Sequence, residues 1–196
     1  REVTLGKDGL FHSINKGSVY IDNTTASAEI ARELYKNAKS KGFDFLDAPV
    51  SGGQAGAENG ALTVMIGGDE ETFKKASPVI DCYSKKMKLL GPPGSGQLAK
   101  MVNQICIAGI VQGLSEAINF GLNAKLKMED VIEVISKGAA QSWQMENRHK
   151  TMIDDKFDYG FAVDWMRKDL KIAMEESKRN NSPLPITKII DEYYAE

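Results

Sequence analysis

The sequence predicts an α/β portion followed by an all-helical portion. Over the first ninety residues, short runs of β-forming residues alternate with segments of helical periodicity, a pattern typical of strands joined by helical crossovers. A glycine- and proline-rich break, Gly91-Pro-Pro-Gly-Ser-Gly96, comes next, and beyond it the strand pattern stops. We therefore expect an α/β domain over residues 1–93 and an all-helical domain over residues 94–196.

The α/β portion contains four runs that predict strands. They are separated by polar turns or by helical segments, and they lie at residues 18–22, 43–50, 61–66 and 85–90. A helix is expected over 27–40, where Ile30, Leu34 and Ala38 share one face and Gly42 supplies the stop signal. A second helix is expected over 70–78, ending at Pro78. The segment 51–60 is rich in glycine and is interpreted as a loop.

The second portion contains five segments that predict helices. They cover 97–125, 128–136, 141–155, 163–179 and 185 to the end. The first is apolar nearly all round, which is typical of a helix buried inside a domain or between two subunits. Trp143 and Trp165 are expected to be core aromatic residues.

Composition excludes several classes of function. The 196 residues carry a formal charge of −2 with both signs dispersed, which does not indicate a nucleic-acid groove. No continuous apolar run approaches the roughly 20 residues of a membrane span, and no signal peptide is recognisable. Cys82 and Cys106 lack CxxC spacing, and two histidines cannot build a histidine-rich metal site. We expect a cytoplasmic protein that needs no metal and binds neither nucleic acid nor membrane.

The first candidate site is Asp47-Ala-Pro-Val-Ser51-Gly52-Gly53, where a strand runs into a segment with few side chains. Glycines let backbone amides approach a ligand closely, and with the Ser51 hydroxyl they can form a nest for a carboxylate or phosphate. A plain strand-to-strand turn would show the same composition. Local physics leaves both interpretations open.

The second candidate site lies at the start of the long apolar helix. Lys100, Asn103 and Gln104 are three and four residues apart, so they share one helical face. Partial desolvation and the positive end of the helix dipole would both lower the pKa of such a lysine and suit it to acid/base chemistry. The alternative is a lysine whose stem packs while its ammonium reaches water. The neighbouring glycines, Gly91 to Gly96, are interpreted as a linker, because a dinucleotide loop joins the first strand and helix of a βαβ unit.

Four motifs together resemble one family. They are Asp22-Asn-Thr-Thr25, Asp47-Ala-Pro-Val-Ser-Gly-Gly, Gly94-Ser-Gly-Gln-Leu-Ala-Lys100 and Lys168-Asp169-Leu170. In this order they resemble the β-hydroxyacid dehydrogenases, in the branch of 3-hydroxyisobutyrate dehydrogenase and tartronate-semialdehyde (glyoxylate/succinic semialdehyde) reductase. The resemblance covers essentially the whole chain. It implies a Rossmann-type dinucleotide-binding domain followed by a helical domain for substrate binding and oligomerisation.

The resemblance also implies roles for particular residues. Lys100 would be the general acid/base in hydride transfer between NAD or NADP and a small β-hydroxyacid or its semialdehyde. The other roles divide between the two ligands, with substrate binding by Ser51, Gly52, Gly53 and Asn103 or Gln104, and cofactor binding by Thr25, Phe161, Lys168 and Asp169. Without the resemblance, Lys168 and Asp169 would be taken as solvated charges. The long helix is expected to pack in a homodimer or homotetramer.

The family's first strand and its Gly-x-Gly-x-x-Gly loop are not in this sequence, which opens at Arg1 without an initiator methionine. We therefore expect a piece of a longer protein, whose nucleotide-binding domain is partial and which has little activity by itself. Two alternatives remain. One is a non-catalytic dehydrogenase-like module that only oligomerises, which the intact Lys100 disfavours. The other is the phosphogluconate branch, which carries a much larger helical domain.

Overall fold

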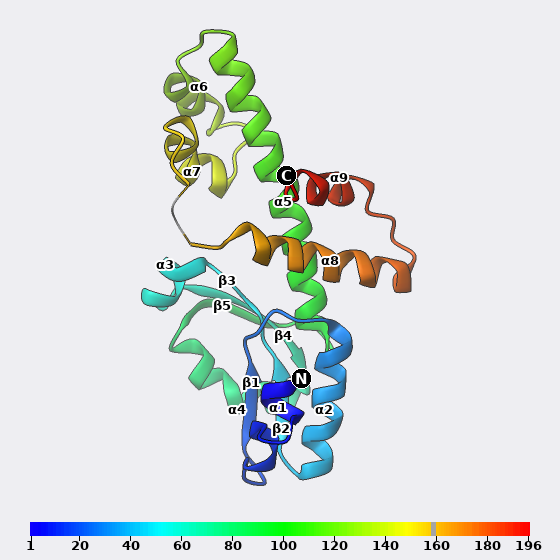
Figure 1. The fold of residues 1–196 in the computed structure, drawn as a ribbon. Coiled ribbons are helices and arrows are strands. Elements are labelled where there is room, and N and C mark those ends of the chain that lie inside the picture. Colours follow the sequence, from blue (N-terminus) through cyan, green and yellow to red (C-terminus); the bar gives the residue numbers. More distant parts are fainter. Residues whose placement is uncertain (158–159) are drawn as a thin grey trace.

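The computed structural model describes residues 1–157 and 160–196, and the strands of that part all lie before residue 90. They form one sheet in the order β1-β2-β4-β3, with β5 paired to β4 (Figure 1). Parallel pairing of β1 with β2 and of β4 with β5 confirms the expected crossover connections, whereas β2 and β3 both run antiparallel to β4. The strands are β1 Val19–Asp22, β2 Asp44–Asp47, β3 Val50–Ser51, β4 Leu62–Gly68 and β5 Ser84–Leu89.

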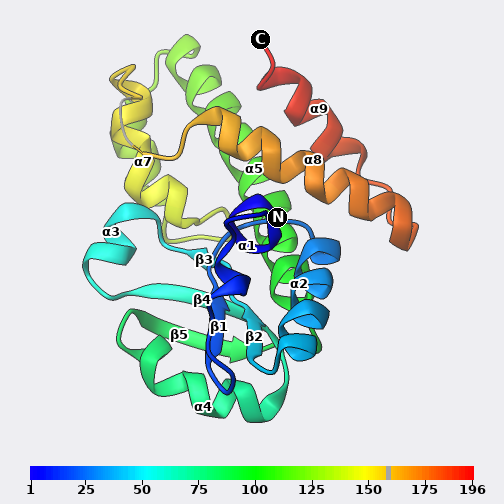
Figure 2. The ribbon, with the colours of Figure 1, turned by 60° about the horizontal axis from the view of Figure 1, so that its bottom comes forward.

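Helices cover both faces of this sheet because its strands alternate buried side chains between the faces (Figure 2). On β2, Phe45 packs with helix α2 (Ala28–Lys41), while its neighbour Leu46 packs in the cluster that contains α4 (Glu70–Asp81). The ends of α2 follow from its sequence, since the Ser27 hydroxyl caps the Ile30 amide and Gly42 adopts φ 84°. Helix α1 (Glu2–Leu5) and a 3-10 turn (Leu10–His12) precede the sheet.

The glycine-rich segment is not the loop that its composition predicted. It contains helix α3 (Gly53–Glu58), in which the Gln54 side chain donates a hydrogen bond of 2.7 Å to Glu58. A Cβ on Gly56 would lie 3.1 Å from Leu62 Cδ2, so the absence of a side chain there lets α3 pack closely onto β4. The glycines serve close packing as well as turning, which composition alone does not distinguish.

Helix α4 also continues past the predicted stop at Pro78, as far as Asp81. Proline removes one helical donor and disfavours a helix interior. The last turn nevertheless carries Ile80, which is fully buried in the core between α4 and the sheet. Burial of that side chain favours continuation of the helix past the proline.

The second part of the chain is built around one long helix, α5 (Ser95–Asn123) (Figure 1). Around its middle, Ala108 packs with α8 (Val163–Asn180) and α9 (Pro185–Tyr193) through Met166, Leu170 and Ile190. Its far half forms a second cluster with α6 (Met128–Ile135) and α7 (Trp143–Ile153), made of Leu114, Ile118, Met128, Ile132 and Met145. These helices lie within or close to the predicted segments.

Helix α5 is long and apolar enough to cross a membrane by length and composition, with 22% of its most apolar window buried. One such helix is weak evidence for a membrane span, because the mostly buried core helix of a soluble protein passes the same test. The sequence of α5 holds no continuous apolar run of that length, because glycine and polar residues interrupt it.

The two tryptophans are not core residues, so that prediction was wrong. Trp143 is 56% exposed and Trp165 is 58% exposed. In α8 the buried positions are Met166, Asp169, Leu170 and Ala173, and Trp165 lies one residue off that stripe. The guanidinium of Arg148 lies 5.2 Å from the ring of Trp143, at the surface of α7.

Candidate active site around Lys100

The start of α5 is attached to the sheet by one buried carboxylate. Asp47, at the end of β2, is fully buried and accepts hydrogen bonds from the Gly94 amide (2.8 Å) and the Gln97 amide (3.0 Å). Burial raises the pKa of Asp47, and these amide hydrogen bonds oppose the rise. Gly96 must lack a side chain, since a Cβ there would lie 2.4 Å from the Met65 carbonyl oxygen of β4.

Lys100 lies one turn farther along this anchored helix. It is 6% exposed, and its ammonium forms no hydrogen bond or ion pair with residues 1–157 or 160–196. Burial lowers the pKa of Lys100; nearby Asp169 opposes the effect and nearby Lys168 adds to it. The direction is the one that the sequence predicted for this position, with desolvation as the largest cause.

Asn103 and Gln104, which share the predicted polar face with Lys100, belong to a hydrogen-bond network. The Gln104 amide is 1% exposed; it donates to Asp169 Oδ2 at 2.7 Å and accepts from the Asn103 side chain at 2.8 Å. Gln104 is therefore committed to protein partners, while Asn103 is half-buried. Asp169 is itself 1% exposed, so it is not a solvated charge.

The structure also brings together residues that the family resemblance assigned to the cofactor. The Lys168 ammonium donates to the Thr25 carbonyl oxygen at 2.9 Å and lies 3.0 Å from Asp169 Oδ1. That carboxylate oxygen is buried and accepts no well-aligned hydrogen bond within the described chain. Phe161, by contrast, is 56% exposed at φ 71°, and no contact joins it to Thr25 or Lys168 among the described interactions.

The predicted substrate loop lies on the neighbouring strand. Ser51 pairs with Thr63 of β4, two residues before Met65, whose carbonyl oxygen faces Gly96 at the start of α5. Gly52 and Gly53 adopt φ values of 135° and 61°, which side chains disfavour. No hydrogen bond in the described part of the chain joins this loop to Lys100; β4 pairs with β3 and also contacts α5.

Two structurally important residues had no assigned role in the sequence-based site, Asp47 and Gln97. Asp47 stood inside a recognised motif, yet its partners are 47 and 50 residues away in sequence. Gln97 is 1% exposed and bonds to the loop after β1. Neither pairing has a local periodicity that could have revealed it.

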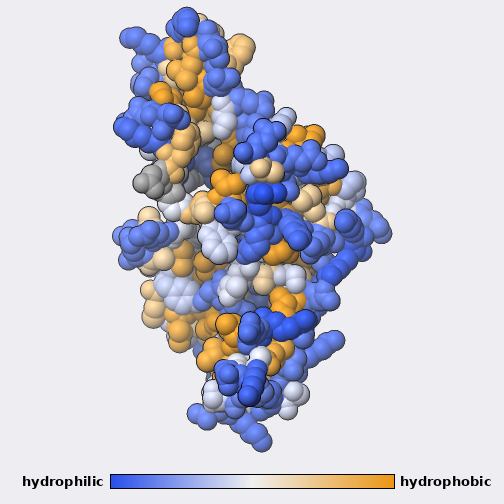
Figure 3. Space-filling view, in the orientation of Figure 1, coloured by the Kyte–Doolittle hydropathy of each residue, from blue (hydrophilic) through white to orange (hydrophobic). Residues whose placement is uncertain are grey.

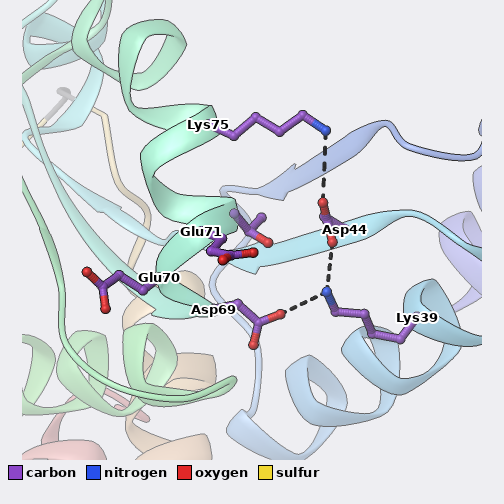
Figure 4. A pocket seen from close by; sticks show the side chains of 7 residues that line it. Lys39, Asp44, Asp69, Glu70, Glu71 and Lys75 are labelled. Atoms are coloured by element: carbon purple, nitrogen blue, oxygen red, sulfur yellow. Dashed lines mark hydrogen bonds and ion pairs between the residues drawn. The ribbon is translucent and has the colours of Figure 1, made fainter.

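A charged crevice of about 340 Å³ opens at the other end of β2, away from Lys100 (Figure 4). Lys39 bridges Asp44 at 2.7 Å and Asp69 at 2.8 Å, and hydrogen bonds to these carboxylates raise the pKa of Lys39. Lys75 lies 3.9 Å from Asp44. Glu70 and Glu71 also line the crevice, so its carboxylates outnumber its lysines. Because Lys39, Asp44 and Asp69 pair with one another, we interpret the crevice as a structural ion-pair cluster.

The donors near Lys100 fit the nicotinamide end of a dinucleotide. Thr25 and Ala48 follow the carboxyl ends of the parallel strands β1 and β2, where ligands of α/β sheets bind. The ammonium of Lys168, which is held by the Thr25 carbonyl oxygen and by Asp169 Oδ1, provides a hydrogen-bond donor there. Among the described residues, no cluster of three or more His, Cys, Asp or Glu side chains could hold a metal ion.

Comparison with known proteins gives matches along both parts of the chain. Residues 1–91 match the sequence model of the NAD binding domain of 6-phosphogluconate dehydrogenase. Residues 94–196 match the model described as NAD-binding of NADP-dependent 3-hydroxyisobutyrate dehydrogenase. The family's cofactor is thus NAD or NADP.

Individual relatives agree with these models. An uncharacterized oxidoreductase of Shewanella frigidimarina is 59% identical over all of this chain and 67% of its own length. The 2-hydroxy-3-oxopropionate reductase of Escherichia coli is 33% identical over 98% of this chain and 66% of its own. A solved structure of Mycobacterium tuberculosis 3-hydroxyisobutyrate dehydrogenase with L-serine superposes with a TM-score of 0.84 at 30% identity, covering 96% of this chain and 67% of that one.

The chain spans about two thirds of the length of the curated relatives that it matches. Within that span, the fold, both sequence models and the relatives agree with the four motifs around Lys100. The chain therefore belongs to the 3-hydroxyisobutyrate dehydrogenase family of β-hydroxyacid dehydrogenases.

Proposed function

We propose that the whole protein that contains this chain is an NAD(P)-dependent oxidoreductase interconverting a small β-hydroxyacid and its semialdehyde. The observation that carries the proposal is Lys100, buried on α5 with a lowered pKa and lying near Asp169 and Lys168. A lysine in this environment can hold or release a proton at a pH where an exposed lysine stays charged.

Lys100 is the proposed acid/base. In the oxidation direction its neutral amine takes the proton of the substrate hydroxyl, and in reduction its ammonium returns that proton to the carbonyl oxygen. A nicotinamide held by Thr25 and Lys168 would accept or supply the hydride. An ammonium close to the reacting oxygen also stabilises the negative charge that develops there, and more strongly in a dry site than in water.

The Ser51 loop is the proposed seat of the substrate carboxylate. Its hydroxyl and the first amides of α3 can donate to an anion, because the first amides of a helix lack partners within that helix. Asn103, half-buried beside Gln104, completes the proposed pocket. Gln104 keeps Asn103 in place rather than meeting the substrate, since its own amide is held by Asp169.

Thr25 and Lys168 are the proposed contacts to the cofactor, and their direct hydrogen bond supports this assignment. Asp169 lies behind them and acts through Lys168 and Gln104. Phe161 is exposed and would border the cofactor from the loop before α8. The sequence has no Gly-x-Gly-x-x-Gly loop for the pyrophosphate, so the activity is proposed for the whole protein.

Replacement of Lys100 tests the proposed chemistry. In the whole protein, Lys100→Ala should lower kcat/KM for 3-hydroxyisobutyrate or tartronate semialdehyde by about 10²–10⁴-fold, the usual contribution of a general acid/base. Lys171→Ala is the matched control, because Lys171 is exposed on α8. Turnover is followed by the absorbance of the reduced nicotinamide. Unchanged turnover by Lys100→Ala would show that Lys100 is not the acid/base.

Burial of the Lys100 ammonium should also lower the free energy of unfolding. Because the pKa of Lys100 is lower in the fold than in the unfolded chain, the unfolded state binds the extra proton between these two pKa values. Stability due to this group therefore rises with pH through that window, and each unit of pKa difference corresponds to about 1.4 kcal/mol.

Lys100→Met should accordingly raise the free energy of unfolding of the 196-residue chain at pH 7. The gain should shrink as the pH approaches 10.5, the ordinary value for lysine. Urea titrations at several pH values measure the effect, with Lys171→Met as control. A Lys100→Met chain less stable than wild type at pH 7 would contradict a desolvated lysine.

We also propose that the whole protein is a homodimer or homotetramer assembled through α5. Val102, Gly109, Gly113 and Phe120 fall on one face of α5, where Val102 and Phe120 are 63% and 74% exposed. A Cβ on either glycine would meet nothing within 4 Å. A second helix could therefore approach this face of α5 closely.

The total surface area also supports assembly. The chain exposes 11889 Å² of accessible surface, whereas a compact chain of this mass would expose about 9,200 Å². Figure 3 shows apolar side chains among charged ones at the end of the molecule that Figure 1 labels α6.

Sedimentation velocity tests the assembly. Phe120→Glu should shift the protein to monomer, because a charge buried in an apolar interface is strongly unfavourable. Val79→Glu, at an exposed valine on α4, should leave the assembly unchanged. A wild-type protein that stays monomeric at micromolar concentration would refute the proposal.

A further inference from the structure

Gln97 joins the helix of Lys100 to the loop that follows β1. Its side-chain oxygen accepts from the Ala26 amide at 2.9 Å, and its side-chain nitrogen donates to the Thr24 carbonyl oxygen at 2.7 Å. The residue is 1% exposed. Both ends of one buried amide group are thus satisfied by the same short loop, 71 and 73 residues away in sequence.

These bonds bracket Thr25. Gln97 holds the residues on either side of it, Thr24 and Ala26, while Lys168 binds the carbonyl oxygen of Thr25 itself. Three hydrogen bonds from the helical part of the chain therefore fix three consecutive residues of the loop. Its start is fixed separately, by the Thr24 amide donating to the Asp22 carboxylate at 3.0 Å.

The same residue is tied to Lys100 and to the sheet. Gln97 is three positions before Lys100 on α5, so the two side chains are neighbours on the helix surface. The backbone amide of Gln97 donates to the buried Asp47 carboxylate. One residue thus links the proton-transfer group, the end of β2 and the loop of Thr25.

We propose that Gln97 is a positioning residue, which fixes the distance between Lys100 and the part of the cofactor held at Thr25. The inference rests on the proposed function. Proton and hydride transfer need reacting atoms aligned at about 3–3.5 Å, and a displacement of 1 Å can cost about 10²-fold in rate. A rigid polar link between the two sides suits that requirement, and an apolar side chain of similar size would not supply it.

The structural part of the proposal is tested without cofactor. Hydrogen exchange by NMR on the 196-residue chain should show the Ala26 amide exchanging about tenfold faster in Gln97→Met, since its acceptor is lost. Gln112→Met is the matched control, because Gln112 lies on the same helix and bonds only to Glu116 among the described residues. Unchanged exchange of Ala26 in Gln97→Met would overturn the proposal.

The catalytic part is tested with the whole protein and 3-hydroxyisobutyrate deuterated at the carbon that loses hydride. Gln97→Met should lower kcat by about 10²-fold, raise the deuterium isotope effect on kcat and leave KM for the hydroxyacid unchanged. Gln97→Asn keeps a neutral amide but is one methylene shorter, so its kcat should lie between those of wild type and Gln97→Met. It also replaces Gln97→Met if that variant does not fold.

The outcomes separate the two proposals. Faster exchange at Ala26 with unchanged kcat and isotope effect would overturn the role of Gln97 while leaving the oxidoreductase assignment intact. Full activity of Lys100→Ala would instead refute the proposed function. A lower kcat together with a raised isotope effect, absent in Gln112→Met, supports a positioning role over a general loss of stability.

Discussion

A buried carboxylate facing the first amides of a helix is the interaction on which the rest of this site depends. Asp47 cannot reach water, and an unpaired carboxylate in that place would be very unfavourable. The Gly94 and Gln97 amides supply charge-assisted hydrogen bonds of about 1.5–3 kcal/mol each, at a helix end where negative charge is favoured. The start of α5 is thereby fixed against β2. The positions of Gln97 and Lys100 relative to the sheet follow from this attachment. Gly96 permits the approach, because any side chain there would meet the sheet backbone.

Helix α5 combines an apolar surface with a narrow polar stripe, and the two serve different purposes. Its apolar residues pack against α6 to α9 and leave one face uncovered. The stripe of Lys100 and Gln104 is buried, so its groups must find partners or change their pKa. Gln104 finds Asp169 and Asn103. Lys100 has no such partner in the described chain, and burial lowers its pKa. That contrast is the basis for proposing Lys100, and not Gln104, as the acid/base.

The sequence predicted the order of elements well, because periodicity and caps are local signals. Helix α2 begins after Ser27 and ends at Gly42 as its residues predict. Contacts distant in sequence were not predictable in this way. The two tryptophans were assigned to the core but lie on the exposed sides of α7 and α8, and the glycines of α3 were interpreted only as flexible. Lys100, Thr25 and Lys168 could be selected from motifs, whereas the link through Gln97 depends on how a helix and a loop 71 residues apart meet. Hydrogen bonds between side chains and distant loops produce no periodic pattern in the sequence.

We propose that the fold desolvates Lys100 enough for it to act as the general acid/base. The most direct measurement is the pKa of Lys100 in the 196-residue chain, from NMR of ¹³C-methylated lysines over a range of pH, with Lys100→Arg to assign its signal. Lys100 should titrate clearly below the ordinary lysine value of 10.5. A Lys100 that titrates at 10.5 or above would contradict the account.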